Sequence, residues 1–208
     1  MTLLHIDSSP LGSASVTRQL TADIVKAWTV SRPGTTVVYR DLAAAPPDHL
    51  TGELMQVVKF RNLENLNARQ QSELALTDAL VDELLAAEVM VIGAPMYNFS
   101  VPTQLKAWVD RICQVGRTFR YTEKGPVGLA GGRKVIVASA RGGRYAGTPM
   151  EAALDHQEAY LKAVMGFIGI TDISFVRAEG VAMGPEPRAQ ALEAAGREIE
   201  RLVASPAA

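Results

Sequence analysis

Hydroxyl side chains crowd the segment that follows the first apolar run of the 208-residue chain. Ser9, Ser15 and Thr17 lie between that run, at residues 3–6, and a stretch with helical periodicity. Hydroxyl groups and free backbone N–H groups at a helix N-terminus form a site for a phosphate group. The segment contains neither a lysine nor a GxxxxGK pattern, which disfavours a nucleoside triphosphate. We therefore expect either a monophosphate site or a polar loop with a serine cap.

A second unusual segment follows the apolar run at residues 89–92, and it contains Met96, Tyr97, Asn98 and Phe99 between two prolines. Prolines restrict the backbone, so rings and N–H groups in this loop are held in fixed positions. Such a surface suits a planar ring with polar edges. The alternative is that these aromatic side chains fold back into the core.

A third segment, Ala140, Arg141, Gly142 and Gly143, follows the run at residues 135–138. Paired glycines let backbone N–H groups approach the edge of a ligand closely. Alone, this would be a glycine-rich turn. Together, the three loops favour FMN, with its phosphate on the hydroxyl loop, its ring against the aromatic loop, and N–H dipoles on the reduced ring.

The elements that must position these loops are short apolar runs alternating with helical stretches, a pattern typical of βαβ units around a parallel sheet. We predict a flavodoxin-like three-layer α/β/α sandwich, a five-stranded parallel sheet in the order 2-1-3-4-5, and one domain over residues 1–208. In this order ligands bind beyond strands one and three, where the first two loops meet. The runs lie at residues 3–6, 36–39, 89–92, 135–138 and 173–176, and the last is the least apolar, as for an edge strand.

The connections give further local predictions. The stretch at 43–66 exceeds a normal connection and is expected to carry an extra helix around residues 53–60. Asn67 and Gln70 could form the capping arrangement of the next helix. Ser100 could cap the helix that has Pro102 in its first turn.

Composition narrows the class of protein. A net charge of -1 gives no electrostatic case for nucleic acid or an anionic membrane as partner. Cys113 is the only cysteine, which excludes an intrachain disulfide and a thiolate metal cluster and is compatible with a reducing cytoplasm. The first apolar run is too short for a signal peptide, and no stretch reaches the length of a membrane span. We expect a cytoplasmic protein with no metal site.

Several other polar residues are expected to have ordinary roles. His49 has no neighbour at metal-ligand spacing. Asp155 and Glu158 are predicted to lie on the solvated face of a helix.

Shorter strings complete a family pattern. Arg40–Leu42, Phe119–Thr122, Gly166–Thr171 and Ala178–Gly180, together with the three loops, resemble the FMN-dependent NADH-azoreductase family, whose members also reduce quinones. Some members have serine in place of Thr17 and of Ala140, so a contact at Ala140 must come from its backbone. The resemblance implies FMN contacts at Ser9, Ser15, Val16, Thr17, Met96, Tyr97, Asn98, Phe99, Ala140, Arg141, Gly142 and Gly143.

The resemblance also implies an activity. NADH or NADPH would reduce the flavin, and a quinone or azo compound would then reoxidise it at the same ring, in a ping-pong cycle without a catalytic side chain. A homodimer is implied, its pocket completed by the second subunit, with Lys59, Phe60, Tyr121 and Phe167 as the candidate lining. A flavodoxin-type electron carrier is the alternative, disfavoured because such carriers are usually strongly acidic. A hydrolase is a second alternative, but the sequence shows no metal-ligand cluster and no nucleophile paired with a base.

Overall fold

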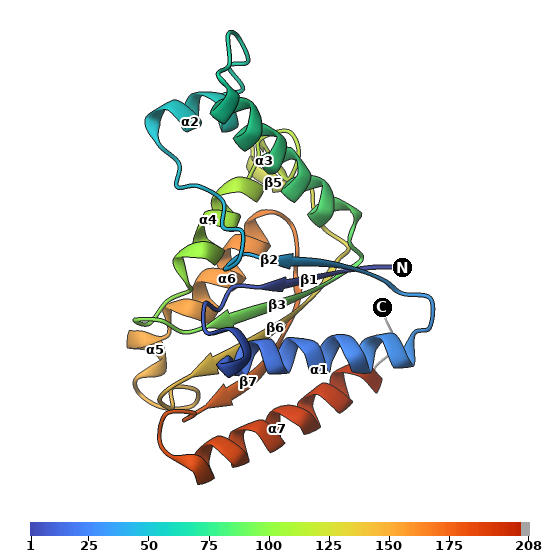
Figure 1. Cartoon of the computed structure of the whole chain (residues 1–208), viewed down its shortest axis with the longest axis vertical. Coiled ribbons are helices and arrows are strands. Elements are labelled where there is room, and N and C mark those ends of the chain that lie inside the picture. Colours follow the sequence, from blue (N-terminus) through green and yellow to red (C-terminus); the bar gives the residue numbers. More distant parts are fainter. Residues whose placement is uncertain (205–208) are drawn as a thin grey trace.

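The computed structural model describes residues 1–204. Five parallel strands form one sheet in the spatial order β2–β1–β3–β6–β7 (Figure 1). This order confirms the predicted 2-1-3-4-5 arrangement of the five apolar runs, and β7 lies at an edge, as its weaker apolar character predicted. The strands are β1 (Thr2–Asp7), β2 (Thr36–Asp41), β3 (Val89–Pro95), β6 (Lys134–Arg141) and β7 (Asp172–Glu179).

Helices cover both faces of the sheet, which explains why the central strands are continuously apolar. Leu3 and Val91 pack with α1 (Val16–Ser31) and α7 (Pro185–Ala204) on one face. Their neighbours Leu4 and Ile92 point to the opposite face. There they pack with α3 (Ala68–Ala86), α4 (Thr103–Ile112) and α6 (His156–Phe167) (Figure 1).

The long connection after β2 carries the expected extra helix, α2 (Gly52–Val58), which stands above the sheet together with the first turns of α3 (Figure 1). Thr51 caps α2, its hydroxyl accepting from the Leu54 amide at 3.3 Å. Asn67 and Gln70 form the predicted capping box at α3, because each side chain accepts from the other residue's amide at 2.9 Å.

Three local features differ from the sequence predictions. Ser100 does not cap α4, because its backbone N–H and C=O pair with Tyr97 and the N-cap position belongs to Pro102. The apolar positions Leu154, Leu161, Val164 and Ile168 have the spacing of one helix, but the structure divides this stretch into α5 (Glu151–Leu154) and α6, with Asp155 between them capping α6. A hairpin of β4 (Phe119–Thr122) and β5 (Gly125–Gly128) forms a separate sheet that the sequence analysis did not predict. No helix within residues 1–204 is long and apolar enough to cross a membrane.

The hairpin packs on the turn after α6 through a contact between glycine backbones. Gly169 has φ +97, which a residue with a side chain adopts only with strain. A Cβ built on Gly128 would lie 2.1 Å from the Gly169 nitrogen. This close approach explains why position 169 of the Gly166–Thr171 motif is a glycine. The motif fixes the position of the hairpin against the turn after α6.

We predict that Gly128→Ala lowers the free energy of unfolding by about 3 kcal/mol, the upper part of the range for overpacking, because backbone atoms cannot rotate away. Urea denaturation of the purified variant measures this. Gly166→Ala is the matched control: its added Cβ meets nothing within 4 Å, and alanine favours a helix. Equal stability of the two variants would contradict the packing account.

Candidate functional site

The carboxyl ends of β1 and β3 meet beside a cavity at one edge of the sheet. The buried Ser8 hydroxyl donates to the Gly93 carbonyl at 2.6 Å and ties the two strand ends together. All three of the predicted loops contribute to the cavity. It is lined by Ser9, Leu11, Ala14, Ser15, Val16, Thr17, Pro95, Met96, Tyr97, Ala140, Gly142, Val181 and Arg188.

The hydroxyl loop ends on the first turn of α1, and Ser15 caps this helix. Ser15 Oγ accepts from the Arg18 amide at 3.3 Å and lies 3.1 Å from Thr17 Oγ1. The amides of Val16 and Thr17 have no acceptor within the helix and lie at the positive end of its dipole. The serine cap that the sequence analysis offered as one alternative is confirmed, and the phosphate site stays a prediction for the same turn.

The aromatic loop is a tight turn in a strained conformation. Tyr97 and Ser100 exchange two backbone hydrogen bonds, at 3.0 and 3.1 Å. The two residues between them, Asn98 and Phe99, have φ of 48 and 72, as a type I′ turn requires. Asparagine tolerates this region, whereas a phenylalanine there costs about 1–3 kcal/mol. Backbone strain of this size is typical of loops whose shape serves a ligand.

Asn98 and Phe99 project beyond the cavity rather than line it. The Phe99 ring is 42% exposed and meets Tyr145 edge-to-face, with centroids 6.5 Å apart. Its carbonyl accepts from the His156 amide at 3.1 Å, which fixes the turn on the start of α6.

The glycine loop is tied by its backbone to the turn that follows β7. The carbonyls of Arg141, Gly142 and Gly143 accept from the amides of residues 180–182 at 2.8 to 3.2 Å. A trans peptide points its N–H opposite to its C=O. The amides of Gly142 and Gly143 therefore face away from that turn. Gly142 also lines the cavity.

The Arg141 side chain does not enter the cavity. It is fully buried, and its guanidinium contacts Asp155 at 2.9 Å, Glu158 at 2.5 Å and Glu179 at 2.8 Å. Only its backbone is available for the ligand contact predicted at this position. The prediction that Asp155 and Glu158 are solvated is wrong, because they are 8% and 3% exposed and neutralise this cation.

The same network connects the aromatic loop to the glycine loop. Gln157 Nε2 donates to the Ala94 carbonyl at 2.6 Å, and Gln157 Oε1 accepts from the Ser139 hydroxyl at 3.0 Å and from Arg141 at 3.2 Å. Glu179 Oε1 accepts from the Tyr145 amide at 3.1 Å. Arg141 thus holds the ends of β3, β6 and β7 in one arrangement.

The residues predicted for the second subunit's share of the pocket lie outside this cavity. Lys59 Nζ donates to the Cys113 carbonyl at 2.7 Å and to the Asp110 carbonyl, at the end of α4, and burial lowers the pKa of this lysine. Phe60 and Tyr121 are exposed, at 66% and 69%.

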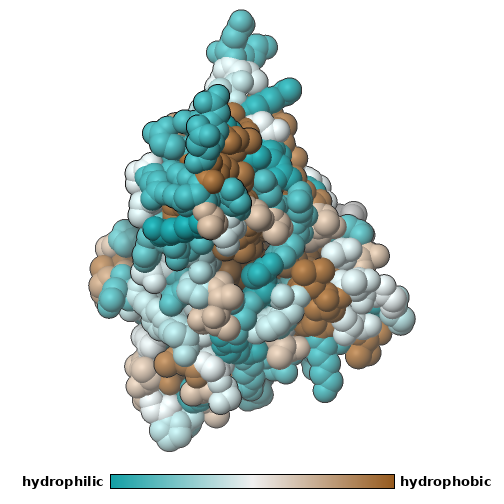
Figure 2. Space-filling model, turned by 45° about the horizontal axis from the view of Figure 1, so that its top comes forward, coloured by the Kyte–Doolittle hydropathy of each residue, from teal (hydrophilic) through white to brown (hydrophobic). Residues whose placement is uncertain are grey.

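Phe167 joins Tyr121 through a third ring. The Phe119 ring lies between them, with centroids 4.5 Å from Phe167 and 5.5 Å from Tyr121. Figure 2 shows hydrophobic residues gathered among hydrophilic ones in the upper part of the molecule, the part that carries α2. Phe60 and Leu63, which follow α2 in the chain, are both exposed.

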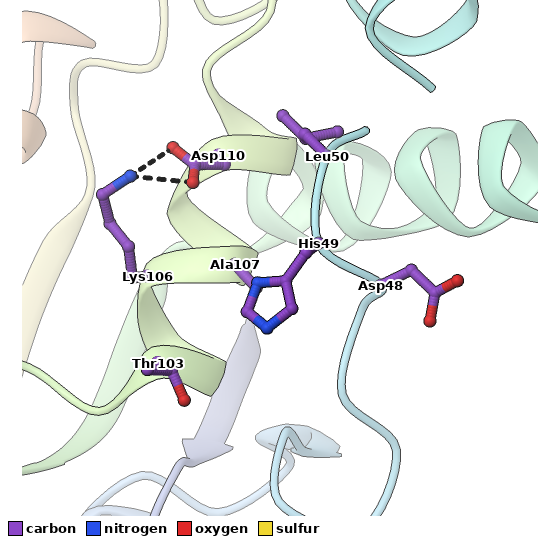
Figure 3. A pocket seen from close by; sticks show the side chains of 7 residues that line it. All are labelled: Asp48, His49, Leu50, Thr103, Lys106, Ala107 and Asp110. Carbon is purple, nitrogen blue, oxygen red and sulfur yellow. Dashed lines mark hydrogen bonds and ion pairs between the residues drawn. The ribbon is translucent and has the colours of Figure 1, made fainter. Parts of the chain in front are cut away.

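A separate small pocket lies between residues 48–50 and α4 (Figure 3). The His49 ring turns toward Ala107 and Thr103, while Asp48 turns away. Lys106 Nζ is paired with both Asp110 oxygens at 2.7 Å. The pocket contains no residue of the three loops. No group of three or more His, Cys, Asp or Glu residues within 1–204 could hold a metal ion.

Sequence analysis missed Val181 and Arg188 in the cavity wall. Both follow β7, whose carboxyl end lies at the same edge of the sheet. The position of these two residues in the cavity wall follows from the sheet topology. Neither their residue types nor their spacing in the sequence indicates it.

The sheet order, with a cavity at its switch point, defines a protein of the flavodoxin-like class. A family model described as the flavodoxin-like fold matches residues 1–203. Two relatives carry the name FMN-dependent NADH:quinone oxidoreductase. The one from Azospirillum brasilense is 69% identical over 208 residues and all of both chains. The one from Ralstonia nicotianae is 59% identical over 98% of this chain and 97% of its own.

The chain belongs to the family of FMN-dependent NADH:quinone oxidoreductases, which confirms the predicted resemblance. Solved structures agree. An FMN-dependent NADH-azoreductase from Bacillus anthracis, in complex with FMN, has a TM-score of 0.89 at 26% identity and covers 98% of both chains. A second azoreductase from Bacillus anthracis has a TM-score of 0.87 at 26% identity, again over 98% of both chains.

We predict that Arg141→Met lowers the free energy of unfolding by about 3–5 kcal/mol, because it leaves buried carboxylates without their cation. Thermal and urea denaturation of the flavin-free protein measure the loss independently of any ligand. Lys106→Met removes an exposed pair with Asp110 and should change stability by under about 1 kcal/mol. If Arg141→Met unfolds like the control, the network does not hold the strand ends.

Proposed function

We propose that this protein is an FMN-dependent NADH:quinone oxidoreductase that also reduces azo compounds. The observation that carries the proposal is the meeting of a hydroxyl-lined helix N-terminus, an aromatic turn and the glycine loop around one cavity at the switch point. Each of these three features matches one part of FMN, in the same order: the dianionic phosphate, the planar ring, and the polar ring edge that gains charge on reduction.

The residues present fit this cofactor. Ser9, Ser15 and Thr17 would hold the phosphate together with the amides of the first turn of α1. Met96 and Tyr97, which line the cavity, would form the wall against the ring, and Asn98 and Phe99 would contact the flavin from outside this lining. The backbone of Ala140 to Gly143 would contact the ring edge. The buried Arg141 side chain would hold this backbone in position.

When bound, FMN would supply the redox chemistry between NADH and a quinone or azo acceptor. The protein itself would orient the cofactor and its substrates and would shield the reacting ring from water. Tyr97 OH lies 3.4 Å from Ser9 Oγ and so belongs to the contact between the aromatic loop and the hydroxyl loop. The proposed chemistry needs no proton from Tyr97. This division explains why the site needs no nucleophile paired with a base.

The electron-carrier alternative has weaker support. The relatives named above are enzymes with a small-molecule acceptor in their names. The net charge of -1 also gives this chain little of the acidic surface by which such carriers meet their partners.

We also propose that the protein acts in the cytoplasm as a homodimer. Phe60, Tyr121 and Phe167 expose much of their rings, yet none lines the cavity of its own chain. A second copy would cover this apolar surface and would place the three rings over the first copy's flavin. Lys59, in contrast, is engaged at the end of α4, so its part in the pocket would be to fix the position of Phe60.

The proposed cycle predicts ping-pong kinetics, because NADH and acceptor use the same ring in turn. Initial rates of NADH oxidation, measured with a water-soluble quinone over a grid of both concentrations, should give parallel double-reciprocal lines. Lines that intersect would show that both substrates are bound at once and would contradict the shared site.

Phe167→Ala should raise the quinone KM more than it alters FMN content, because the ring would contact the acceptor and not the cofactor. Steady-state kinetics and flavin absorbance per protomer measure the two effects. Val30→Ala, an exposed apolar position on α1, is the control and should change neither. Loss of FMN at an unchanged KM would sink the assignment of Phe167.

A further inference from the structure

Arg18 links the hydroxyl loop to the end of a neighbouring strand. Its guanidinium donates to the Ser9 carbonyl from Nε at 3.0 Å and from Nη2 at 2.9 Å. On its other side it pairs in a bidentate manner with Asp41, Nη1 to Oδ2 at 2.8 Å and Nη2 to Oδ1 at 2.7 Å. The two side chains are largely buried, at 18% and 22% exposure. Asp41 belongs to the Arg40–Leu42 string, which the proposed cofactor contacts do not explain.

The position of Arg18 in its helix is unfavourable by itself. It lies in the first turn of α1, where a cation opposes the helix dipole, and this turn contains no acidic residue. Asp41 supplies the missing negative charge from β2. The Arg18 guanidinium holds the pKa of Asp41 below its ordinary value, against the effect of burial, so the pair is ionised at neutral pH.

Asp41 extends the link into the chain that leaves β2. Its Oδ1 also accepts from the amides of Ala43 at 2.9 Å and Ala44 at 3.2 Å. Arg18 and Asp41 therefore connect three segments, which are the hydroxyl loop, the first turn of α1, and the start of the long connection.

The N–H groups of Arg18 are all in use. A guanidinium has five N–H donors. Two go to the Ser9 carbonyl, two to Asp41, and the last to the Tyr39 hydroxyl at 3.1 Å. The Tyr39 hydroxyl in turn donates to Asp7 at 3.1 Å. The Arg18 charge is balanced by Asp41 and by Asp7, whose Oδ2 lies 3.6 Å from Nη1. With its donors engaged in this way, Arg18 would act on a phosphate through Ser9 rather than by direct contact.

We propose that Arg18 and Asp41 are positioning residues that preorganise the hydroxyl loop for the phosphate of the cofactor. This inference rests on the proposed function, because it assigns the phosphate end of FMN to that loop. By fixing the Ser9 carbonyl, the pair sets where the Ser9 hydroxyl lies relative to Ser15 and to the free amides of α1. The loop then accepts the dianion without first having to be ordered.

The test compares two flavins that differ only in the phosphate. Flavin-free protein is titrated with FMN and with riboflavin, and binding is followed by quenching of flavin fluorescence. Arg18→Met should weaken FMN binding by about tenfold or more, the loss expected for hydrogen bonds of a charged group, and change riboflavin binding by under about twofold. Asp41→Asn, which keeps the side-chain shape, should weaken FMN binding in the same selective way.

Arg40→Met is the matched control. Arg40 neighbours Asp41 on β2, and it pairs with Glu83 of α3 at a similar exposure, 25% and 20%, from the opposite face of the strand. It should leave the affinity for both flavins unchanged. Thermal unfolding of each flavin-free variant reports whether the protein is folded, and Asp41→Asn carries the test if Arg18→Met does not fold.

Equal losses for FMN and riboflavin would overturn the inference, since the pair would then support the fold alone. Unchanged FMN binding in a folded variant would also overturn it. Tighter FMN binding by Asp41→Asn would show that Arg18 acts by its charge and not by position. Wild-type protein that binds neither flavin would overturn the proposed function, whereas wild-type binding of FMN with unaltered binding by Arg18→Met overturns this inference alone.

Discussion

The Arg141 guanidinium, enclosed by Asp155, Glu158 and Glu179, is the interaction on which the ring end of the site depends. A fully buried cation is stable only when its partners are fixed around it, and the three partners come from two segments, the start of α6 and the end of β7. Asp155 begins α6, Glu158 lies in its first turn, and Glu179 ends β7. Through Gln157 the network also reaches the end of β3. The loops after β3 and β6 thus keep one relative position, which a flat, rigid ring requires.

The phosphate end repeats this design with a smaller cluster. Arg18 and Asp41 form a pair across the end of the sheet, and the Ser9 carbonyl is attached to it. In both clusters an arginine acts behind the loop and the loop presents backbone or hydroxyl groups to the cavity. These two arginines would thereby shape the site from behind the loops that line it. We see in this arrangement the reason that loops of small and strained residues can hold a defined shape.

Sequence reasoning identified the sheet, its order and the loops at the switch point, because these depend on local patterns. An apolar run such as that of β3 indicates a buried strand, and unusual residues directly after it must lie at the carboxyl edge. It could not identify the partners of buried charges. Asp155 and Glu158 have the spacing of a solvated helix face, and only the tertiary approach of Arg141 buries them. The hairpin of β4 and β5 was missed since its strands have four residues each and one is mostly exposed. Arg188 reaches the cavity by topology alone.

The absorption spectrum of the purified protein, followed by titration of the flavin-free form with FMN, tests the central claim most directly. The account predicts a yellow protein with flavin absorption, release of FMN on denaturation, and uptake of about one FMN per chain at the single cavity built by the three loops. A colourless protein that fails to take up added FMN would contradict it.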